Sequence, residues 1–260
     1  MLPNANHMLP CVCFGMVILF AVYMTCSVNA QEVGITELKS VQANQTIPIE
    51  EEKPLIISGL GDSILYGDRL EDTFDSFLYL MGKEIGKPVI YNYGLCGSAL
   101  SGKNADRLLD RYQNMNPDSD YIVVFGGTND YGYGVPLGKM EDRTDETFYG
   151  GLHLLVQGLM DGYPNSRICL LTPIRRLQDT KANSLGFQLQ DYADAIMKVA
   201  DYYGVIALNL LEEEELDFTK SLRTYMPDGL HPNEKGHQKM AEYLIQEFRN
   251  IIKTREQYQQ

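Results

Sequence analysis

Residues 121–130 read YIVVFGGTND, in which the apolar run Tyr121 to Phe125 leads directly into two glycines and the polar residues Thr128, Asn129 and Asp130. A short apolar run that is rich in β-branched and aromatic residues and stops at glycines predicts a strand buried on both faces. Strands of this kind are typical of parallel sheets covered by helices on both sides. The polar residues would then lie at the carboxyl end of the strand, where such sheets bind ligands.

Two periodicities alternate on either side of this strand. Short apolar runs predict four more strands, at residues 55–60, 89–93, 168–171 and 205–210. Apolar residues at helical spacing predict helices at residues 73–85, 105–115, 147–160, 187–203 and 234–252. Strands separated by helices imply right-handed crossovers and a five-stranded parallel sheet of the α/β class. No internal repeat or change of composition after Pro54 marks a second domain, so we expect one domain at residues 54–260.

The first 30 residues contain no Asp, Glu, Lys or Arg. They include the apolar run Cys11 to Thr25 and end in Val28-Asn29-Ala30, whose small residues suit a signal peptidase. We interpret residues 1–30 as a signal peptide cleaved after Ala30, which predicts a secreted or extracytoplasmic protein without stable membrane insertion. The alternative is an uncleaved anchor at residues 8–28, because the run approaches the length that spans a bilayer. Residues 31–53 are polar and predict a linker.

Charge and cysteine content exclude several classes of function. The chain has 22 Lys and Arg against 35 Asp and Glu, a net charge of -13, so we expect no nucleic-acid partner and no anionic membrane surface as partner. Three cysteines belong to the predicted signal peptide, which leaves Cys96 and Cys169 for the domain. Two cysteines form no disulfide framework and have no metal-ligand spacing. We interpret them as unpaired thiols, with a single disulfide as the alternative.

Four loops of the predicted domain carry residues suited to chemistry. Gly61-Asp62-Ser63 follows the first strand, residues 92–97 (NYGLCG) follow the second, residues 126–130 (GGTND) follow the third, and residues 228–233 (DGLHPN) precede the last helix. A serine on a sharp turn, an amide, glycine N–H groups and an Asp-x-x-His pair together indicate nucleophilic acyl transfer. Each loop alone could be an ordinary turn or helix cap. Four of them at strand ends and before the last helix favour a catalytic site.

Elimination identifies the general base. Only His153, His231 and His237 lie in the predicted domain. His153 falls within an apolar helix and is expected to be packed or half-exposed, and His237 follows Gly236 in the last helix as a solvated or capping residue. His231 lies in a loop with Asp228 three residues before it, which makes it the best general base in the chain.

The motifs GDSI, GGTND and DGLHPN, together with the loop after the second strand, resemble the blocks of the SGNH (GDSL-type) hydrolase family in order and spacing. The resemblance covers residues 55–253 and implies a flavodoxin-like three-layer α/β/α sandwich with a five-stranded parallel sheet. By this resemblance Ser63 is the nucleophile, His231 the base and Asp228 the carboxylate that orients the base. No metal or organic cofactor is implied.

The resemblance also implies an oxyanion hole, made of the backbone N–H groups of Ser63 and Gly97 and the side-chain amide of Asn129. Gly97 is chosen over Gly94 by its distance from Asn92 in the family pattern. Asp62 and Asp130 would support their loops. Ile64 replaces the leucine of the GDSL motif, and Cys96 stands where a small polar residue is frequent.

Substrate contacts are predicted from two further segments. Tyr131 and Tyr133 begin what reads as a long loop, to about residue 145, where they would stack on sugar rings or be ordinary exposed tyrosines. Arg175 and Arg176 follow the fourth strand and would bind an anionic group or be surface charges. Export, polar glycine-rich loops and the habit of the family favour a serine esterase that removes short, acetyl-type groups from carbohydrate or cell-wall glycan.

Other functions remain open at this stage. The same residues would serve an O-acyltransferase, or a lysophospholipase or thioesterase of the same family. A non-catalytic glycan-binding module is the alternative of another class. The joint presence of Ser63, Asn129, Asp228 and His231 argues against that module.

Overall fold

The computed structural model describes residues 53–103 and 106–258. The predicted signal peptide, the alternative anchor and all of the predicted linker except Lys53 lie outside the described residues. Within these residues no helix is long and apolar enough to cross a bilayer. Cys96 is exposed and Cys169 is buried, and both are free thiols as expected.

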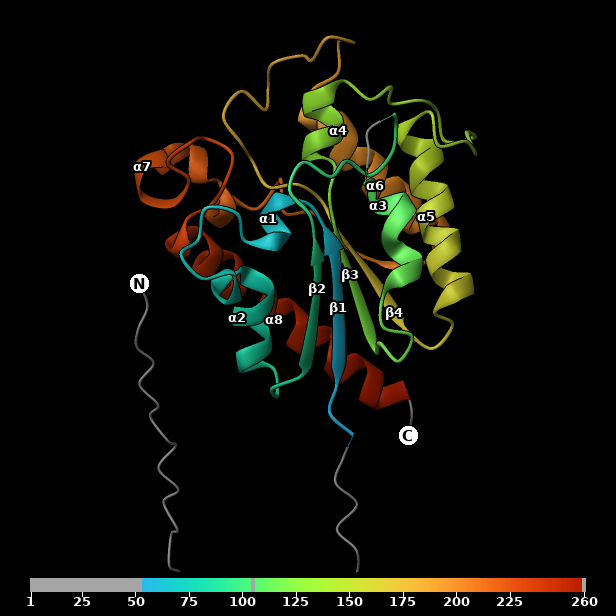
Figure 1. Ribbon diagram of the computed structural model, residues 1–260, viewed down its shortest axis with the longest axis vertical. Helices are drawn as coiled ribbons and strands as arrows, with labels where there is room; N and C mark the ends of the chain where they lie inside the picture. Colours follow the sequence, from blue (N-terminus) through green and yellow to red (C-terminus); the bar gives the residue numbers. More distant parts are fainter. Residues whose placement is uncertain (1–52, 104–105, 259–260) are drawn as a thin grey trace, which may run out of the picture. The chain divides into compact units, whose positions relative to one another are not determined.

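Five parallel strands form one sheet, which confirms the predicted fold class. Along the sheet the order is β2-β1-β3-β4-β5. The chain passes from β1 outward to β2 and then crosses back to β3, so the carboxyl ends of β1 and β3 border a topological switch point. Figure 1 shows these ends directed toward α1 and α4. The strands are β1 (Ile56–Gly61), β2 (Val89–Gly94), β3 (Tyr121–Phe125), β4 (Arg167–Leu171) and β5 (Ile206–Leu208).

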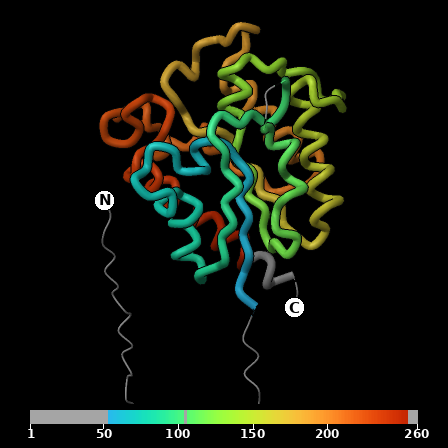
Figure 2. The backbone as a smooth tube through the Cα atoms, in the orientation of Figure 1, coloured from blue at the N-terminus to red at the C-terminus, as the bar shows by residue number. Residues whose placement is uncertain are grey.

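Helices cover both faces of the sheet (Figures 1 and 2). One face packs against α2 (Phe77–Glu84) and α8 (Glu234–Tyr258). The other packs against α3 (Leu108–Arg111), α5 (Phe148–Gly162) and α6 (Leu189–Tyr203). The domain therefore has the three layers that its alternation of strands and helices predicts.

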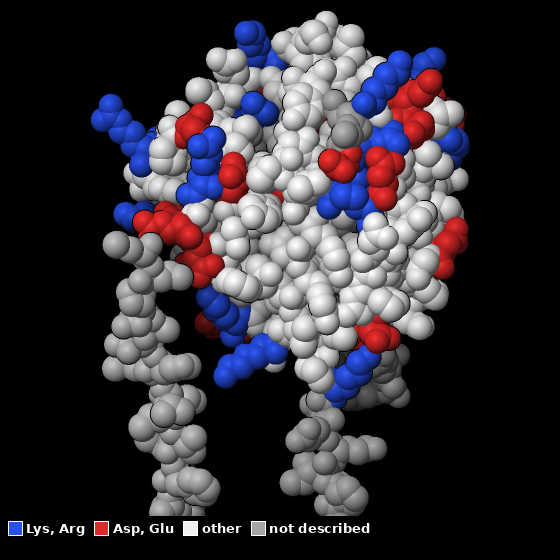
Figure 3. All heavy atoms as spheres, in the orientation of Figure 1, with Lys and Arg blue, Asp and Glu red and all other residues white. Residues whose placement is uncertain are grey.

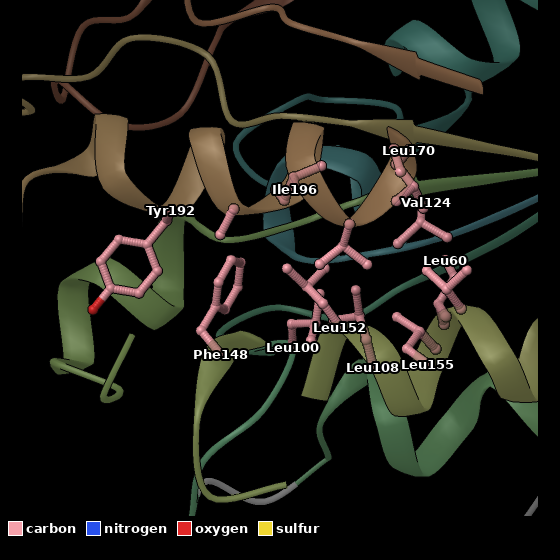
Figure 4. Close-up of a cluster of buried hydrophobic side chains, with 14 of the residues drawn as sticks. Leu60, Leu100, Leu108, Val124, Phe148, Leu152, Leu155, Leu170, Tyr192 and Ile196 are labelled. Carbon is pink, nitrogen blue, oxygen red and sulfur yellow. The ribbon is translucent and has the colours of Figure 1, made fainter. Parts of the chain in front are cut away.

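Strand β3 supplies both hydrophobic cores. Tyr121, Val123 and Phe125 pack with residues of α2 and α8, whereas Ile122 and Val124 pack with residues of α3, α5 and α6. All five side chains are buried, as the alternation of side chains along a strand between two helical layers requires. Figure 4 shows part of the second core, where side chains of the sheet, α5 and α6 meet, among them Leu60, Leu155 and Ile196.

Two expected helices differ from the prediction. The segment 73–85 is divided into a 3₁₀ turn, η1 (Thr73–Asp75), and α2, because Ser76 between them has an extended backbone (φ -66°, ψ 153°). The segment 105–115 contains only α3 and the 3₁₀ turn η2 (Tyr112–Asn114). Arg107 before α3 is extended, and Asp106 has a φ of 55°, so the helix begins only at Leu108. Helical spacing of apolar residues does not reveal such breaks.

Several short helices were not predicted from the sequence. Two of them follow strands directly, so that β1 leads into α1 and β3 leads into α4. Both lie at the carboxyl edge of the sheet and position residues of the candidate site. The unpredicted helices are α1 (Ser63–Tyr66), α4 (Thr128–Tyr133), α7 (Leu222–Tyr225), η3 (Glu214–Leu216) and η4 (Phe218–Ser221).

Candidate active site

Ser63 is the first residue of α1, directly after β1. The carboxylate of Asp62 caps this helix by accepting a hydrogen bond from the N–H of Ile64 at 2.9 Å. The N–H of Ser63 has no acceptor within the helix, because the first N–H groups of a helix are always left over. Gly61 allows the sharp turn, since a Cβ there would stand 2.8 Å from the carbonyl oxygen of Phe125. The turn thus presents both the hydroxyl and the free N–H of Ser63 at the switch point.

The structure brings Ser63, His231 and Asp228 into one chain of hydrogen bonds. Ser63 Oγ lies 3.0 Å from His231 Nε2, and His231 Nδ1 lies 2.8 Å from Asp228 Oδ2. Asp228 Oδ1 also accepts the backbone N–H of Leu230 and that of His231. With Nδ1 donating to the carboxylate, Nε2 is left as the acceptor for the serine hydroxyl. This is the arrangement needed to remove a proton from Ser63.

The pKa of Asp228 shows that its charge is stabilised. Partial burial alone would raise this pKa, but the hydrogen bonds from the His231 backbone, the His231 ring and Leu230 outweigh burial and lower the pKa below its usual value. Asp228 is therefore ionised at neutral pH and oriented by three donors. It can fix the tautomer of His231 and stabilise the imidazolium form.

Three donors that follow the carboxyl ends of β1, β2 and β3 are the predicted oxyanion hole: the N–H groups of Ser63 and Gly97 and the side-chain amide of Asn129. Gly94 and Gly97 differ in their partners: the N–H of Gly94 donates to Asn92 Oδ1 at 2.9 Å, while the N–H of Gly97 has no acceptor among the described residues and is available to a ligand. Asn129 Nδ2 donates one hydrogen bond to the carbonyl of Ser98 at 3.0 Å and retains a second N–H. Gly97 has a φ of 75°, a conformation that favours glycine.

Asp130 joins the loop after β2 to α4. Its carboxylate is fully buried and accepts the N–H of Leu100 at 2.9 Å and that of Ser101 at 3.1 Å. Burial raises its pKa to about 6, although these hydrogen bonds oppose the shift. Because Asn129 precedes Asp130 and bonds to Ser98, the two residues together hold the Gly97 loop against α4. The predicted supporting role of Asp130 matches these contacts.

The two tyrosines predicted to contact substrate, Tyr131 and Tyr133, differ in their exposure in the structure. Tyr131 is not on an exposed loop: it lies in α4, is 6% exposed, and its hydroxyl donates to the carbonyls of Gln178 and Lys181. Its role in stacking on substrate was wrongly predicted, because the glycines around it read as a loop. Tyr133 is exposed and donates to the carbonyl of Gly97 at 3.2 Å, which places it beside the site.

The two arginines after β4 point to different partners. Arg175 pairs with Asp179 at 3.0 Å. Arg176 is half-buried, donates to the carbonyl and hydroxyl oxygens of Thr128, and lies over the ring of Tyr131 at 5.6 Å. Burial lowers the pKa of Arg176, and the neighbouring Tyr131 and Asp179 are the main groups that oppose the shift. Arg176 therefore supports the start of α4, next to Asn129.

The other two histidines are structural. His153 is buried and bonds to the hydroxyl of Tyr203 at 3.1 Å, as a packed residue would. His237 was predicted to be a solvated or capping residue, and this prediction is wrong: its side chain is fully buried. Its Nδ1 accepts a hydrogen bond from the N–H of Phe77 at 3.1 Å. Burial lowers the pKa of His237 to about 4, so it is neutral at physiological pH. Within the described residues no group of three or more His, Cys, Asp or Glu is arranged to hold a metal ion.

One charged residue at the site was missed by the sequence analysis. Asp68 Oδ2 lies 3.7 Å from His231 Nε2, the nitrogen that faces Ser63. No motif marks Asp68, because its position depends on the turn after α1 and not on a family block. The sequence signal for this turn is Gly67, a residue type that favours the left-handed conformation after a short helix.

A doubly wound sheet that holds a Ser-His-Asp chain at its switch point has the layout of an α/β serine hydrolase. Comparison with known proteins agrees with this layout. The family model described as GDSL-like Lipase/Acylhydrolase matches residues 60–239. The chain belongs to this family, a family of ester-hydrolysing enzymes, as its motifs predicted.

Individual proteins and solved structures are similar to this chain in sequence or in fold. A multidomain esterase from Ruminococcus flavefaciens is 31% identical over 146 residues, which are 54% of this chain and only 17% of that protein. A solved structure from Lactobacillus plantarum has 32% identity, a TM-score of 0.67, and coverage of 75% of this chain and 95% of its own. A structure from Bacteroides ovatus, described as a GDSL-like lipase, shares the fold with 20% identity, a TM-score of 0.57, and coverage of 76% and 100% respectively.

Proposed function

We propose that this protein is an exported serine esterase that removes short acyl groups, such as acetyl, from carbohydrate or cell-wall glycan. The observation that carries the proposal is the hydrogen-bonded chain from Ser63 through His231 to Asp228. Such a chain activates a hydroxyl as a nucleophile toward a carbonyl carbon. Family membership supports the ester as the bond that is cleaved.

In the proposed mechanism each residue of the site has one step. Ser63 Oγ attacks the ester carbonyl while its proton passes to His231 Nε2, and the N–H groups of Ser63 and Gly97 and the Asn129 amide receive the oxyanion. The C–O bond to the alcohol then breaks, and the leaving oxygen takes the proton from Nε2. Water next gives its proton to Nε2 and attacks the acyl-enzyme, which releases the carboxylic acid and regenerates Ser63. Each oxyanion donor contributes on the order of 3 kcal/mol in comparable sites.

The surroundings of the site support a short acyl group and a polar alcohol. A hollow of about 440 Å³ adjoins the site through Tyr133 and is lined also by Gly134, Pro136, Lys103 and Glu146. Glycine, a ring and charged side chains suit a glycan more than a long alkyl chain. Neither this hollow nor a second, mainly apolar one of about 330 Å³ is lined by Ser63, Asp228 or His231. The first is linked to the site by the hydrogen bond from Tyr133 to the carbonyl of Gly97, whereas none of the residues that line the second, among them Phe74, Tyr79 and Ile90, bonds to Gly97.

Export rests on the sequence of residues 1–30, which lie outside the described residues. The charge-free apolar run followed by Val28-Asn29-Ala30 supports cleavage by a signal peptidase after Ala30. Determining the amino-terminal sequence of the protein recovered from the medium or periplasm tests this. Mature protein beginning at Gln31 is expected, and a membrane-bound form that retains residues 8–28 would contradict it.

Substitution of the nucleophile tests the esterase proposal. We expect the protein to hydrolyse p-nitrophenyl acetate and to bind a fluorophosphonate probe covalently, and Ser63→Ala to lose both while its circular dichroism is unchanged. Ser221→Ala is a matched control, since Ser221 is exposed and its side chain caps no helix. Labelling that persists in Ser63→Ala would overturn the assignment.

Acyl length and acceptor complete the test. Among p-nitrophenyl esters from acetate to palmitate, we expect acetate and its short homologues to be preferred, and a preference for palmitate would contradict the short acyl group. Products formed in the presence of an added sugar alcohol separate hydrolysis from acyl transfer. Free acid as the main product supports the esterase, whereas an acylated acceptor as the main product would indicate an acyltransferase.

A further inference from the structure

The backbone after the nucleophile places Asp68 next to the reacting groups. Helix α1 ends at Tyr66 and is capped by Gly67, whose φ of 92° turns the chain back on itself. The N–H of Gly67 and that of Asp68 both donate to the carbonyl of Ser63, at 3.0 and 2.9 Å. A Cβ on Gly67 would stand 3.0 Å from Ser76 Cβ, so this turn needs glycine. Asp68 is thus fixed to Ser63 by backbone hydrogen bonds, not held by a flexible loop.

The carboxylate of Asp68 has acceptor capacity to spare. Oδ2 lies 3.7 Å from His231 Nε2, which is beyond hydrogen-bond distance, and Nε2 is already engaged by Ser63 at 3.0 Å. Its ion-pair partner Arg69 lies at 3.4 Å with 68% of the side chain exposed. Within residues 53–103 and 106–258 no hydrogen bond is donated to this carboxylate, in contrast to Asp228, which accepts three. The side chain of Asp68 is 34% exposed, so a ligand can reach it.

The position of the leaving alcohol follows from the proposed mechanism. The leaving oxygen must come within hydrogen-bond distance of His231 Nε2, because this nitrogen protonates it. A hydroxyl on the neighbouring carbon lies roughly 3 Å from that oxygen when the two are gauche. Asp68 Oδ2 is itself 3.7 Å from Nε2. A hydroxyl beside the ester oxygen therefore falls within reach of this carboxylate.

Building on the proposed esterase function, we propose that Asp68 recognises the alcohol part of the substrate by accepting a hydrogen bond from a free hydroxyl adjacent to the ester oxygen. The preferred substrates are then monoesters of vicinal diols, as in a sugar ring that carries one acyl group beside a free hydroxyl. An ester whose neighbouring hydroxyl is also acylated lacks this donor and is a poorer substrate. Asp68 is thus a specificity-determining residue, distinct from Asp228, which acts through His231.

Two matched esters test the proposal. In 2-hydroxyethyl acetate the neighbouring hydroxyl is a donor, and in 2-methoxyethyl acetate it is blocked by a methyl group. We expect the ratio of their kcat/KM values, measured by pH-stat, to favour the hydroxyl ester by about tenfold or more, as a hydrogen bond to a charged group does. In Asp68→Ala the ratio should approach the ratio found in alkaline hydrolysis without enzyme. Asp68→Asn, which keeps an uncharged acceptor, should give an intermediate ratio.

Controls separate this inference from its alternatives. Glu71→Ala removes the same charge from an exposed position three residues away and should leave the ratio as in the unmodified protein. If Asp68→Ala lowers kcat/KM equally for both esters, Asp68 acts only through His231 and the inference is overturned. An unchanged ratio in Asp68→Ala overturns it as well. A protein that hydrolyses none of the acetates and does not label at Ser63 would instead refute the proposed function itself.

Discussion

Asp228 and Asp62 both adjoin the pair formed by Ser63 and His231, yet the protein surrounds their carboxyl groups in opposite ways. Asp228 has a side chain 40% exposed and three hydrogen-bond donors, and its pKa is lowered. Asp62 is fully buried, one of its oxygens has no partner among the described residues, and burial raises its pKa to about 7. The protein thus stabilises the negative charge of Asp228, next to the base His231. It destabilises the charged form of Asp62, the residue before Ser63.

Removing the charge of Asp228 should have the largest effect. Asp228→Asn keeps the shape but offers His231 Nδ1 an uncharged partner that no longer fixes the productive tautomer. We expect kcat for p-nitrophenyl acetate to fall by roughly 10⁴ with little change in melting temperature. A fall of less than about tenfold would show that another carboxylate replaces Asp228, and Asp68 is then the one to examine in the double variant.

The second prediction concerns Asp62 and the pH dependence of stability. Because folding raises its pKa from 3.8 to about 7, the native state binds more protons than the unfolded state between these values. The contribution of Asp62 to the free energy of unfolding is therefore greatest below pH 4 and falls as pH rises through 7, by up to about 4 kcal/mol. Urea denaturation at pH 4 and pH 8 should show Asp62→Asn gaining stability relative to the unmodified protein over this interval.

A control for Asp62 is available in the next turn of the chain. Asp72 is exposed and caps η1 through the N–H of Phe74 at 2.9 Å, the same contact that Asp62 makes with Ile64. The free energy of unfolding of Asp72→Asn should therefore change between pH 4 and pH 8 by the same amount as that of the unmodified protein. If the free energy of unfolding of Asp62→Asn also changed by the same amount as that of the unmodified protein, the raised pKa of Asp62 would be contradicted.

Asp130 tests whether a buried carboxylate supports the site at a distance. Asp130→Ala leaves the N–H groups of Leu100 and Ser101 without their acceptor, and we expect the free energy of unfolding to fall by about 3 kcal/mol. Because the same bonds hold the Gly97 loop, kcat should fall as well while KM changes less. Loss of stability with an unchanged kcat would show that the loop does not need this anchor.

The smallest effect is expected at Arg175, the arginine predicted to bind substrate. Its guanidinium pairs with Asp179, and the hollow that it lines contains none of the proposed catalytic residues. Arg175→Ala should change kcat/KM for acetate esters by less than about twofold and stability by about 0.5 kcal/mol, as expected for a partly exposed ion pair. A larger fall in kcat/KM, confined to anionic esters, would restore the predicted binding role.

The sequence predicted the sheet well because strand signals are local. Tyr121 to Phe125 is apolar at every position, and its short length, its β-branched and aromatic residues and the glycines after it favour a strand buried on both faces. Ser63, Asp228 and His231 were also found correctly as neighbours, since motifs at the ends of parallel strands meet at one edge. Their catalytic roles remain predictions until the variants above are measured.

The errors arose where tertiary contacts decide the outcome. Gly132 and Gly134 made the segment of Tyr131 read as a loop, but α4 forms there and Tyr131 packs into the core. His237 read as solvated, yet it stacks on Phe77 across the interface of α2 and α8, which no local pattern shows. Asp68 escaped notice because its role depends on the left-handed turn at Gly67.

The surface carries a related lesson about net charge. Figure 3 shows acidic and basic side chains interspersed on the visible face. Several charged side chains of the domain form ion pairs, as Arg107 does with Asp110 and Asp145. The excess of acidic over basic residues therefore says less about the site than the positions of individual carboxylates do. Four carboxylates lie in or next to the site, and each has a different environment. The amino-acid composition does not distinguish them from the other acidic residues; they are Asp62, Asp68, Asp130 and Asp228.

Ser63 and His231 are separated by 168 positions along the chain, although their side chains touch. During synthesis Ser63 and its strand emerge long before His231 and the helix that follows it. A partly made chain therefore holds a serine with no base to activate it. In the proposed mechanism, reactivity toward esters requires that the segment of His231 has docked beside Ser63, so a growing chain that has not yet reached His231 would be inert.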